Sequence, residues 1–139
     1  MPPSEPETWE LRDEEFEAVS ALSPGERYNH LVKQVADRQW IWVLEDDAGL
    51  AGSADDGGRR YLPVWPHARY AETAATGEWA GTKPAAVEIH EWVDDLLPGI
   101  AEKDGMIAAF PTAGDQGYVV PPLGMKRDLE QELSLYEPD

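Results

Sequence analysis

The side chains best suited to chemistry lie close together, where a strand pattern runs into a helix pattern. The stretch covers residues 60–71 and contains Arg60, Trp65, His67, Arg69 and Tyr70. A histidine at the amino end of a helix lies where ligands and reacting groups often bind, and the helix dipole keeps its imidazole neutral. Together with Arg69 and a carboxylate such as Glu72, His67 could hold a small ligand in a pocket at this strand–helix junction.

Other patterns that carry catalysis or bind metals are missing from the sequence. The chain has no cysteine, which excludes disulfides, thiolate ligands and thiol nucleophiles. Ser53 lacks the glycine pattern around a nucleophilic serine, and neither a calcium-binding nor a phosphate-binding loop is present. His30 and His90 are expected to serve packing or capping. We therefore expect no catalytic residue, no metal and no cofactor.

Aromatic side chains favour a second use of the same stretch, as a surface that binds another protein. Tryptophan, tyrosine and arginine dominate interface hot spots, and the chain has six tryptophans. Trp40 and Trp42 share a strand face and are expected in the core, whereas Trp65 and Trp79 flank the third helix and Trp9 lies near the N-terminus. The residues predicted to bind are Arg60, Trp65, His67, Arg69, Tyr70 and Trp79.

The same residues also have a purely structural interpretation. Large aromatic side chains are mostly buried in folded proteins. Arg59, Arg60 and Arg69, which form the one basic patch near Trp65, could each pair with a neighbouring acid. The sequence leaves the binding and the packing interpretations open.

Acidic residues outnumber basic residues by 28 to 11, which gives a formal net charge of −17. Nucleic-acid binding depends on lysine and arginine displacing counterions, so this charge argues against direct binding of DNA or RNA. The acidity is explained by solubility or adaptation to salt, by steering of a basic partner protein, or by mimicry of nucleic acid through a stripe of carboxylates.

Length and composition indicate one domain without a membrane span. A chain of 139 residues is the size of a single domain, and no apolar run approaches the roughly 20 residues that cross a bilayer. Residues 1–12 are predicted to form a disordered, acidic and proline-rich tail, and residues 13–139 the domain. The N-terminus lacks the basic and apolar segments of a secretory signal, so we expect a cytoplasmic location. The oligomeric state is not indicated.

Helical spacing covers residues 13–22, 24–38, 66–77 and 90–104. A last helix is predicted to begin at Pro121-Pro122, and its core positions are Met125, Leu129, Leu133 and Tyr136 or Leu135. The clearest start is Ser23-Pro24-Gly25-Glu26, a capping box with proline in the first turn. After it, one apolar stripe contains Tyr28, Leu31, Val32 and Val35, and Arg27 falls outside this stripe. We expect Asp13 to cap the first helix, Pro66 to open the third, and Pro98-Gly99 to break or kink the fourth.

Strand patterns cover residues 40–44, 50–54, 59–65, 85–89, 106–110 and 118–120. Pro63 removes one hydrogen-bond donor, so its strand is predicted to be an edge at that point or to be bulged. Together these patterns predict an α+β fold, with a single mixed sheet of five to six strands and about four helices packed on it.

Several of these segments carry a family resemblance. They are Glu26-Arg27-Tyr28 before Val35-Ala36-Asp37, then Leu62-Pro63-Val64-Trp65-Pro66-His67, and Ala109-Phe110-Pro111-Thr112 before Val119-Val120-Pro121-Pro122. Through them the chain resembles the small bacterial domain-of-unknown-function family 2750 over roughly residues 13–136. More loosely, Leu62-Pro63-Val64 before a helix is similar to domains of the enhancer-of-serine-sensitivity type, which implies a related α+β layout. Pro122 departs from the pattern, where a short polar cap is expected. The resemblance implies a fold and transfers no activity.

The leading hypothesis is a non-catalytic interaction protein of regulatory or immunity type. It would bind another protein near the segment 65–69, and its acidic surface would steer the encounter. The alternative is a small-ligand binder or an enzyme that uses His67 and Arg69. This alternative predicts a concave pocket with His67 exposed inside it.

Overall fold

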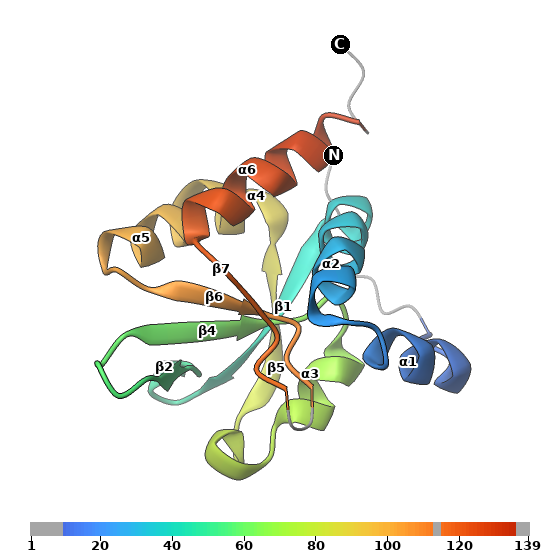
Figure 1. Ribbon diagram of the computed structural model, residues 1–139, viewed down its shortest axis with the longest axis horizontal. Helices are drawn as coiled ribbons and strands as arrows, with labels where there is room; N and C mark the ends of the chain where they lie inside the picture. The colour runs from blue at the N-terminus through green and yellow to red at the C-terminus, as the bar shows by residue number, and fades with distance from the viewer. Residues whose placement is uncertain (1–9, 113–114, 136–139) are drawn as a thin grey trace.

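The computed structural model describes residues 10–112 and 115–135 and has the α+β class expected from the sequence. Its helices are α1 (Asp13–Ser20), α2 (Pro24–Arg38), α3 (Ala68–Ala74), a continuous helix made of α4 (Ile89–Glu91), the π-helix η2 (Trp92–Leu96) and α5 (Leu97–Glu102), and α6 (Pro122–Leu133). A short 3-10 helix, η1 (Gly77–Trp79), follows α3. Figure 1 shows α4, α5 and α6 on one side of the strands and α3 on the other.

Seven strands form two sheets among these residues. They are β1 (Trp40–Asp46), β2 (Gly49–Leu50), β3 (Ser53–Ala54), β4 (Arg60–Val64), β5 (Lys83–Glu88), β6 (Met106–Ala109) and β7 (Tyr118–Val120). One sheet is antiparallel with the order β2-β1-β5, and the other has the order β3-β4-β6-β7, in which β4 and β6 are parallel. The prediction of a single sheet of five to six strands is therefore wrong.

The two sheets are joined by one bridge only, where the prediction of a single sheet requires continuous strand pairing. Trp42 of β1 and Trp65, just beyond β4, exchange two backbone hydrogen bonds of 2.9 Å. The strand predicted over residues 50–54 divides, because β2 pairs with β1 and β3 pairs with β4. Each half still has a strand pattern, so the sequence gives no sign of the division. Pro63 has β6 on one side, and β3 pairs only with the first two residues of β4, so the predicted edge position is confirmed.

Helix α2 forms as the sequence predicts, with one exception. Ser23 Oγ accepts a 3.3 Å hydrogen bond from the N–H of Glu26, and Glu26 Oε1 accepts a 3.1 Å bond from the N–H of Ser23, which completes the capping box. The predicted apolar stripe is buried and contains Tyr28, Leu31, Val32 and Val35. Arg27, expected outside this stripe, is also buried.

Helices α1 and α3 begin at other residues than predicted. In α1 the expected cap Asp13 pairs with an arginine, and in α3 a histidine side chain caps a helix that begins two residues after its predicted start. Asp13 lies inside α1 and does not cap it, and its Oδ1 atom lies 2.7 Å from Arg69 Nη2. Helix α3 begins at Ala68 and not at Pro66. The reason is that Nδ1 of His67 accepts a 3.0 Å hydrogen bond from the N–H of Arg69 and caps the helix.

The helix that contains Pro98-Gly99 is not broken there, so of the predicted break or kink the break is wrong. A proline has no N–H for the carbonyl four residues earlier, and its ring crowds that carbonyl. For Pro98 this carbonyl belongs to Asp94, which lies in the π-helix η2, and the wider turn of η2 accommodates the ring. The cap of this helix is Glu88 and not His90, because Glu88 Oε2 accepts a 3.0 Å hydrogen bond from the N–H of His90.

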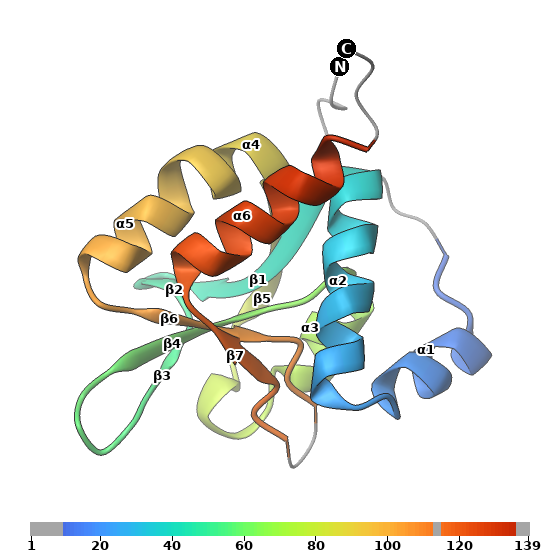
Figure 2. The same cartoon turned by 45° about the horizontal axis from the view of Figure 1, so that its top comes forward.

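The core lies between the strands and the surrounding helices. Figure 2 shows α5 and α6 side by side, with α2 next to α6. The buried residues of α6 include Met125, Leu129 and Leu133, as predicted, and also Pro122. Leu135 is 75% exposed and is not a core residue, and Tyr136 lies outside the described residues. Trp40 and Trp42 are half-buried, with Trp42 packed against the core.

The N-terminal region is described only from residue 10 onward. Leu11 is 6% exposed and belongs to the core, although the sequence interpretation assigned it to the tail. The rest of the predicted tail, including Trp9, lies outside the described residues, so the predicted division into tail and domain is not tested. None of the described helices combines the length and the apolar character that a membrane span requires.

Candidate functional site

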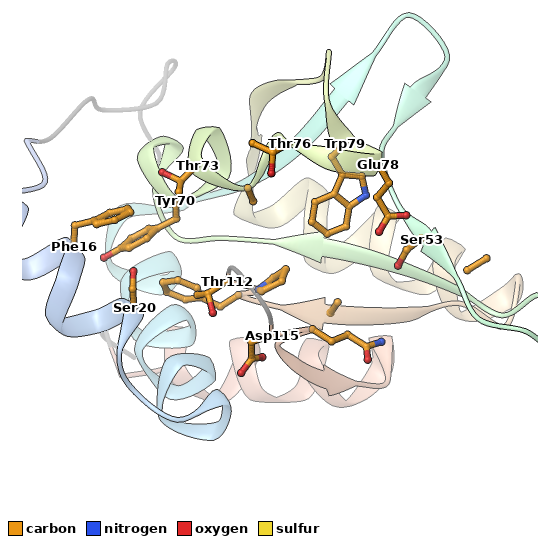
Figure 3. A pocket seen from close by; sticks show the side chains of 16 residues that line it. Phe16, Ser20, Ser53, Tyr70, Thr73, Thr76, Glu78, Trp79, Thr112 and Asp115 are labelled. Atoms are coloured by element: carbon orange, nitrogen blue, oxygen red, sulfur yellow. The ribbon is translucent and has the colours of Figure 1, made fainter.

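A pocket of about 790 Å³ opens between α3, η1 and the loop that joins β6 to β7. We call it the α3 pocket. Its lining residues are Phe16 and Ser20 of α1, Ser53 and Ala54 of β3, Tyr70, Thr73, Ala74, Thr76, Glu78 and Trp79 of the α3–η1 segment, and Ala108, Phe110, Pro111, Thr112, Asp115 and Gln116 of β6 and the following loop. Figure 3 shows Phe16 and Tyr70 together at one end and Ser53 toward the other.

The wall formed by α3 and η1 supplies two aromatic side chains. Tyr70 is 4% exposed, and its ring stacks on Phe16 with 5.1 Å between the centroids. Trp79 is half-buried, and its indole N–H donates a 3.2 Å hydrogen bond to the carbonyl of Gly52. Its ring also meets Trp65 edge to face, with 6.0 Å between the centroids. Contacts to the surrounding fold therefore fix both rings in place.

The opposite wall is a loop with a strained backbone. Phe110 is fully buried and has a φ of 58°, in the left-handed region that non-glycine residues rarely adopt. Gly117 has a φ of 87°, and a Cβ atom there would lie 2.5 Å from the carbonyl oxygen of Ala109. Next to it, Asp115 Oδ1 accepts a 2.6 Å hydrogen bond from the N–H of Gly117. Rare backbone conformations concentrate at functional sites, where the surroundings hold them in place.

Arg27 of α2 holds this loop from behind. Its Nε donates a 3.1 Å hydrogen bond to the carbonyl of Phe110, its Nη1 donates a 2.6 Å bond to the carbonyl of Leu22, and its Nη2 lies 2.9 Å from Asp115 Oδ1. The Arg27 side chain is 3% exposed, so its charge interacts with the loop more strongly than it would in water. Sequence reasoning missed this role because Phe110 is 83 positions away in the chain. The one available signal was the presence of Arg27 in a motif that carries the family resemblance.

The charged groups in the described lining of the α3 pocket are two carboxylates, those of Glu78 and Asp115. The hydrogen bond from Gly117 N–H, assisted by Arg27, holds the pKa of Asp115 below its ordinary value. Glu78 is exposed and has no hydrogen bond or ion pair with any described residue. No lysine, arginine or histidine lies among the described lining residues, so the pocket is negatively charged.

The hydroxyl group of Tyr70 is buried and lacks a hydrogen-bond partner among the described residues. Burial, together with the nearby charge of Glu15, raises the pKa of Tyr70 far above its ordinary value, so the phenol stays protonated. Buried polar groups without a partner are uncommon in folded proteins. Figure 3 shows this side chain at the end of the pocket near Phe16 and Ser20. The hydroxyl is thus buried behind the pocket surface without a partner among the described residues.

The aromatic residues predicted to bind occupy different environments. Tyr70 and Trp79 line the α3 pocket. Trp65 is fully buried, and its indole N–H donates a 3.0 Å hydrogen bond to the carbonyl of Pro111. Trp65 therefore supports the pocket from inside the core and presents no surface to a partner.

The basic residues predicted to bind do not line the α3 pocket. Arg69 binds the carbonyl of Leu11 at 2.8 Å and the carboxylate of Asp13, and its guanidinium lies 4.4 Å from the ring centroid of Phe16. His67 caps α3, as described above, and Arg60 is exposed on β4. The nearby Arg59 pairs with Asp104 at 3.3 Å, so Arg59 and Arg69, both expected in one patch near Trp65, pair with different acids.

The described lining of the α3 pocket combines hydroxyl groups with the two carboxylates. The hydroxyl groups belong to Ser20, Ser53, Tyr70, Thr73, Thr76 and Thr112. Within residues 10–112 and 115–135, no group of three His, Asp or Glu side chains is arranged to hold a metal ion. Sequence reasoning missed Glu78, Asp115 and the lining residues of α1. These residues lie far apart in the chain, and no sequence motif links the segments that contain them.

A second pocket, of about 470 Å³, lies between α2 and α6, and we call it the α2–α6 pocket. Its lining residues are Tyr28, Asn29, Val32, Lys33, Asp128, Gln131, Glu132 and Leu135. The hydroxyl of Tyr28 donates a 2.6 Å hydrogen bond to Asp128 Oδ2, and burial together with this bond raises the pKa of Tyr28. Tyr28 also stacks on Tyr118, with 4.9 Å between the ring centroids.

Comparison with known proteins gives one result. A family model described as "Protein of unknown function (DUF2750)" matches residues 28–129. The matched region contains every described strand and most of α2 and α6, and α1 lies outside it. No curated protein and no solved structure matches the chain. The similarity to domains of the enhancer-of-serine-sensitivity type is therefore not supported and stays a prediction.

Proposed function

The chain belongs to the DUF2750 family of proteins of unknown function, and we propose that it is a non-catalytic module that binds a segment of another protein in the α3 pocket. One observation supports this most strongly. The pocket combines aromatic rings that the fold holds in place with polar groups that have no partner among the described residues. Protein interfaces use the same combination, in which aromatic anchors are surrounded by polar groups.

The size and the lining of the α3 pocket support an extended segment as its occupant. A volume of about 790 Å³ accommodates several side chains. Thr76 and Gln116 are exposed lining residues, and their side chains can bond to the N–H and C=O groups of a peptide. The exposed Thr73 hydroxyl donates to the carbonyl of Arg69 and can still accept from a peptide N–H.

The contacts of His67 and Arg69 speak against the alternative of an enzyme that uses them. A general base must lie within hydrogen-bond reach of the reacting group. Neither side chain lines the α3 pocket, and Arg69 is engaged by Asp13 and Leu11. Nδ1 of His67 accepts the capping hydrogen bond of α3. Binding without catalysis is therefore the function that the geometry favours.

A matched pair of bulky variants tests the proposed function. Thr73 and Glu72 are both exposed on α3, but only Thr73 lines the α3 pocket. We expect Thr73→Trp to obstruct the pocket and to abolish capture of a partner that wild type and Glu72→Trp both recover from native lysate by crosslinking. The segment of that partner that carries the crosslink is then synthesised and bound to wild type. Equal capture by all three proteins would refute the proposal, as would a crosslinked segment that contacts residues outside the pocket.

A further inference from the structure

The described lining residues of the α3 pocket supply acceptor groups and no cationic side chain. Glu78 is exposed on η1 and has no partner among the described residues. On the other wall, Asp115 Oδ1 is engaged by Arg27 and Gly117, whereas no described residue donates to its Oδ2. Both carboxylates therefore have capacity for a donor that a ligand brings with it.

Arg27 does not cancel the negative charge of the pocket. Its guanidinium is buried behind the loop, is not part of the lining, and divides its donors among Asp115 and the carbonyls of Phe110 and Leu22. At most it balances the charge of Asp115. The charge of Glu78 is left without compensation.

The aromatic wall is also suited to a cation. Trp79 follows Glu78 directly in the chain, and both line the pocket. The face of an aromatic ring attracts lysine and arginine, and tryptophan attracts them most strongly. The fold uses this interaction beside the pocket, where the Arg69 guanidinium lies 4.4 Å from the Phe16 centroid and that of Arg27 lies 5.9 Å from the Phe110 centroid. A carboxylate next to an indole ring therefore provides both attractions for a single basic side chain.

The charge of the whole chain acts in the same direction. A formal net charge of −17 concentrates basic partners near the surface and speeds their association. The same charge repels nucleic acid, and it also repels a second copy of this chain. Among macromolecules, a basic protein segment is the occupant that this charge favours.

From these observations we infer that the segment bound in the α3 pocket is basic. A lysine or arginine side chain of the partner lies against Glu78 and Trp79 on one wall and reaches Asp115 on the other. This inference rests on the proposed function and adds the chemistry of the partner. It assigns to Glu78 a role in binding, since this carboxylate contributes no contact to the fold among the described residues.

Three synthetic peptides of equal length test the inference on the full chain. They share the same glycine, serine and tyrosine positions and carry lysine, glutamine or glutamate at all others. Fluorescence anisotropy gives their affinities, and the indole N–H signal of Trp79 in NMR spectra reports where they bind. We expect the lysine peptide to bind about tenfold more tightly than the glutamine peptide, which corresponds to about 1.4 kcal/mol, and the glutamate peptide to bind least.

Two matched variants separate a contact in the pocket from attraction by the whole surface. We expect Glu78→Gln to weaken binding of the lysine peptide about fivefold, in keeping with the loss of a partly exposed charge pair. Glu72→Gln removes one negative charge from an exposed residue of α3 outside the lining, and should change the affinity less than about twofold.

The outcomes distinguish this inference from the proposed function. Equal weakening by Glu78→Gln and Glu72→Gln would overturn the inference, because the attraction would then be general. Equal affinities of the three peptides would also overturn it, while shifts of the Trp79 signal would still support a pocket that binds peptides. If no peptide shifts that signal, the inference fails, and capture by the Thr73→Trp variant decides the proposed function separately.

Discussion

The α3 pocket and the α2–α6 pocket contain similar residue types but differ in how these residues are satisfied. In the α2–α6 pocket the tyrosine hydroxyl and a carboxylate bind each other, since Tyr28 donates to Asp128 at 2.6 Å. In the α3 pocket the hydroxyl of Tyr70 and the carboxylate of Glu78 have no partner among the described residues. The same chemistry thus stabilises the fold where the groups face each other, and stays unpaired among the described residues where they do not.

The two pockets also differ in their walls. The α2–α6 pocket lies between two regular helices. One wall of the α3 pocket is instead a loop whose backbone is strained at Phe110 and Gly117 and is held by Arg27. Substitutions that disturb this loop should therefore cost more than comparable changes at the α2–α6 pocket.

The largest effect is expected for Arg27→Met. The substitution leaves the carbonyls of Phe110 and Leu22 without their donor and removes the ion pair with Asp115, so we expect unfolding to become easier by about 3 kcal/mol. Urea denaturation measures this loss. Lys33→Met is the control, because Lys33 is an exposed residue of α2 that lines the other pocket, and it should change stability by less than about 0.5 kcal/mol. Similar losses for both variants would contradict the difference between the two walls.

A smaller loss is expected for Gly117→Ala. The new Cβ atom would meet the carbonyl oxygen of Ala109 at 2.5 Å in a backbone with a φ of 87°, which should cost about 2 kcal/mol. Gly124→Ala in α6 is the matched control, since a Cβ atom there would lie 3.6 Å from its nearest neighbour, Val120 Cγ2, and it should stabilise the chain by about 0.5 kcal/mol. Thermal unfolding of both variants tests the pair. A gain from Gly117→Ala would show that the loop is not strained.

Two tyrosine substitutions compare the pockets directly. Tyr28→Phe removes the hydrogen bond to Asp128 and should cost about 1 kcal/mol of unfolding free energy. Tyr70→Phe removes a buried hydroxyl that has no partner among the described residues, so stability should stay the same or rise. Chemical denaturation of both proteins gives the two values. Equal losses would mean that the hydroxyl of Tyr70 has a partner, and would remove the difference between the pockets.

The smallest effect concerns the pH dependence of Asp115. Its pKa is lower in the folded chain than the ordinary value of 3.8, so its carboxylate stabilises the fold fully above that value and ceases to do so as the pH falls through the folded pKa. The stability difference between wild type and Asp115→Asn should stay constant between about pH 7 and about pH 5, and should shrink below about pH 4. Urea midpoints across this range measure it. Asp95→Asn, at an exposed residue without an ion pair in the described chain, should follow wild type, and a difference for Asp115→Asn that grows toward low pH would reverse the sign of this argument.

The elements that the sequence predicted correctly depend on local signals. The capping box of Ser23 and Glu26 and the apolar stripe of α2 involve residues a few positions apart, and both are confirmed. The strands form two sheets that are joined by a single bridge between Trp42 and Trp65. No local sequence pattern indicates that the pairing between β1 and β4 is limited to this bridge. Local spacing therefore indicated the elements and the α+β class, and missed how the strands assemble.

The same limit of local patterns explains why the sequence predicts only part of the lining of the α3 pocket. Tyr70 and Trp79 are predicted as binding residues because aromatic side chains are typical of interfaces. Glu78 and Asp115 belong to a large number of acidic residues, and only the folded chain brings these two to one pocket. The sequence pattern of His67 is ambiguous, because a histidine at a helix start looks the same whether it binds a ligand or caps the helix. The structure shows that His67 caps α3.

The bridge between Trp42 and Trp65 has a mechanical consequence for the α3 pocket. Helix α3 packs on β1 and β5, whereas β3, β6 and the loop after β6 belong to the other sheet, so the two walls are carried by different sheets. Within the described residues these sheets share backbone hydrogen bonds only at this bridge, which ties the sheet behind one wall to the sheet that carries the other. Trp65, one of the two bridge residues, is fully buried, so this tie between the two walls lies inside the core.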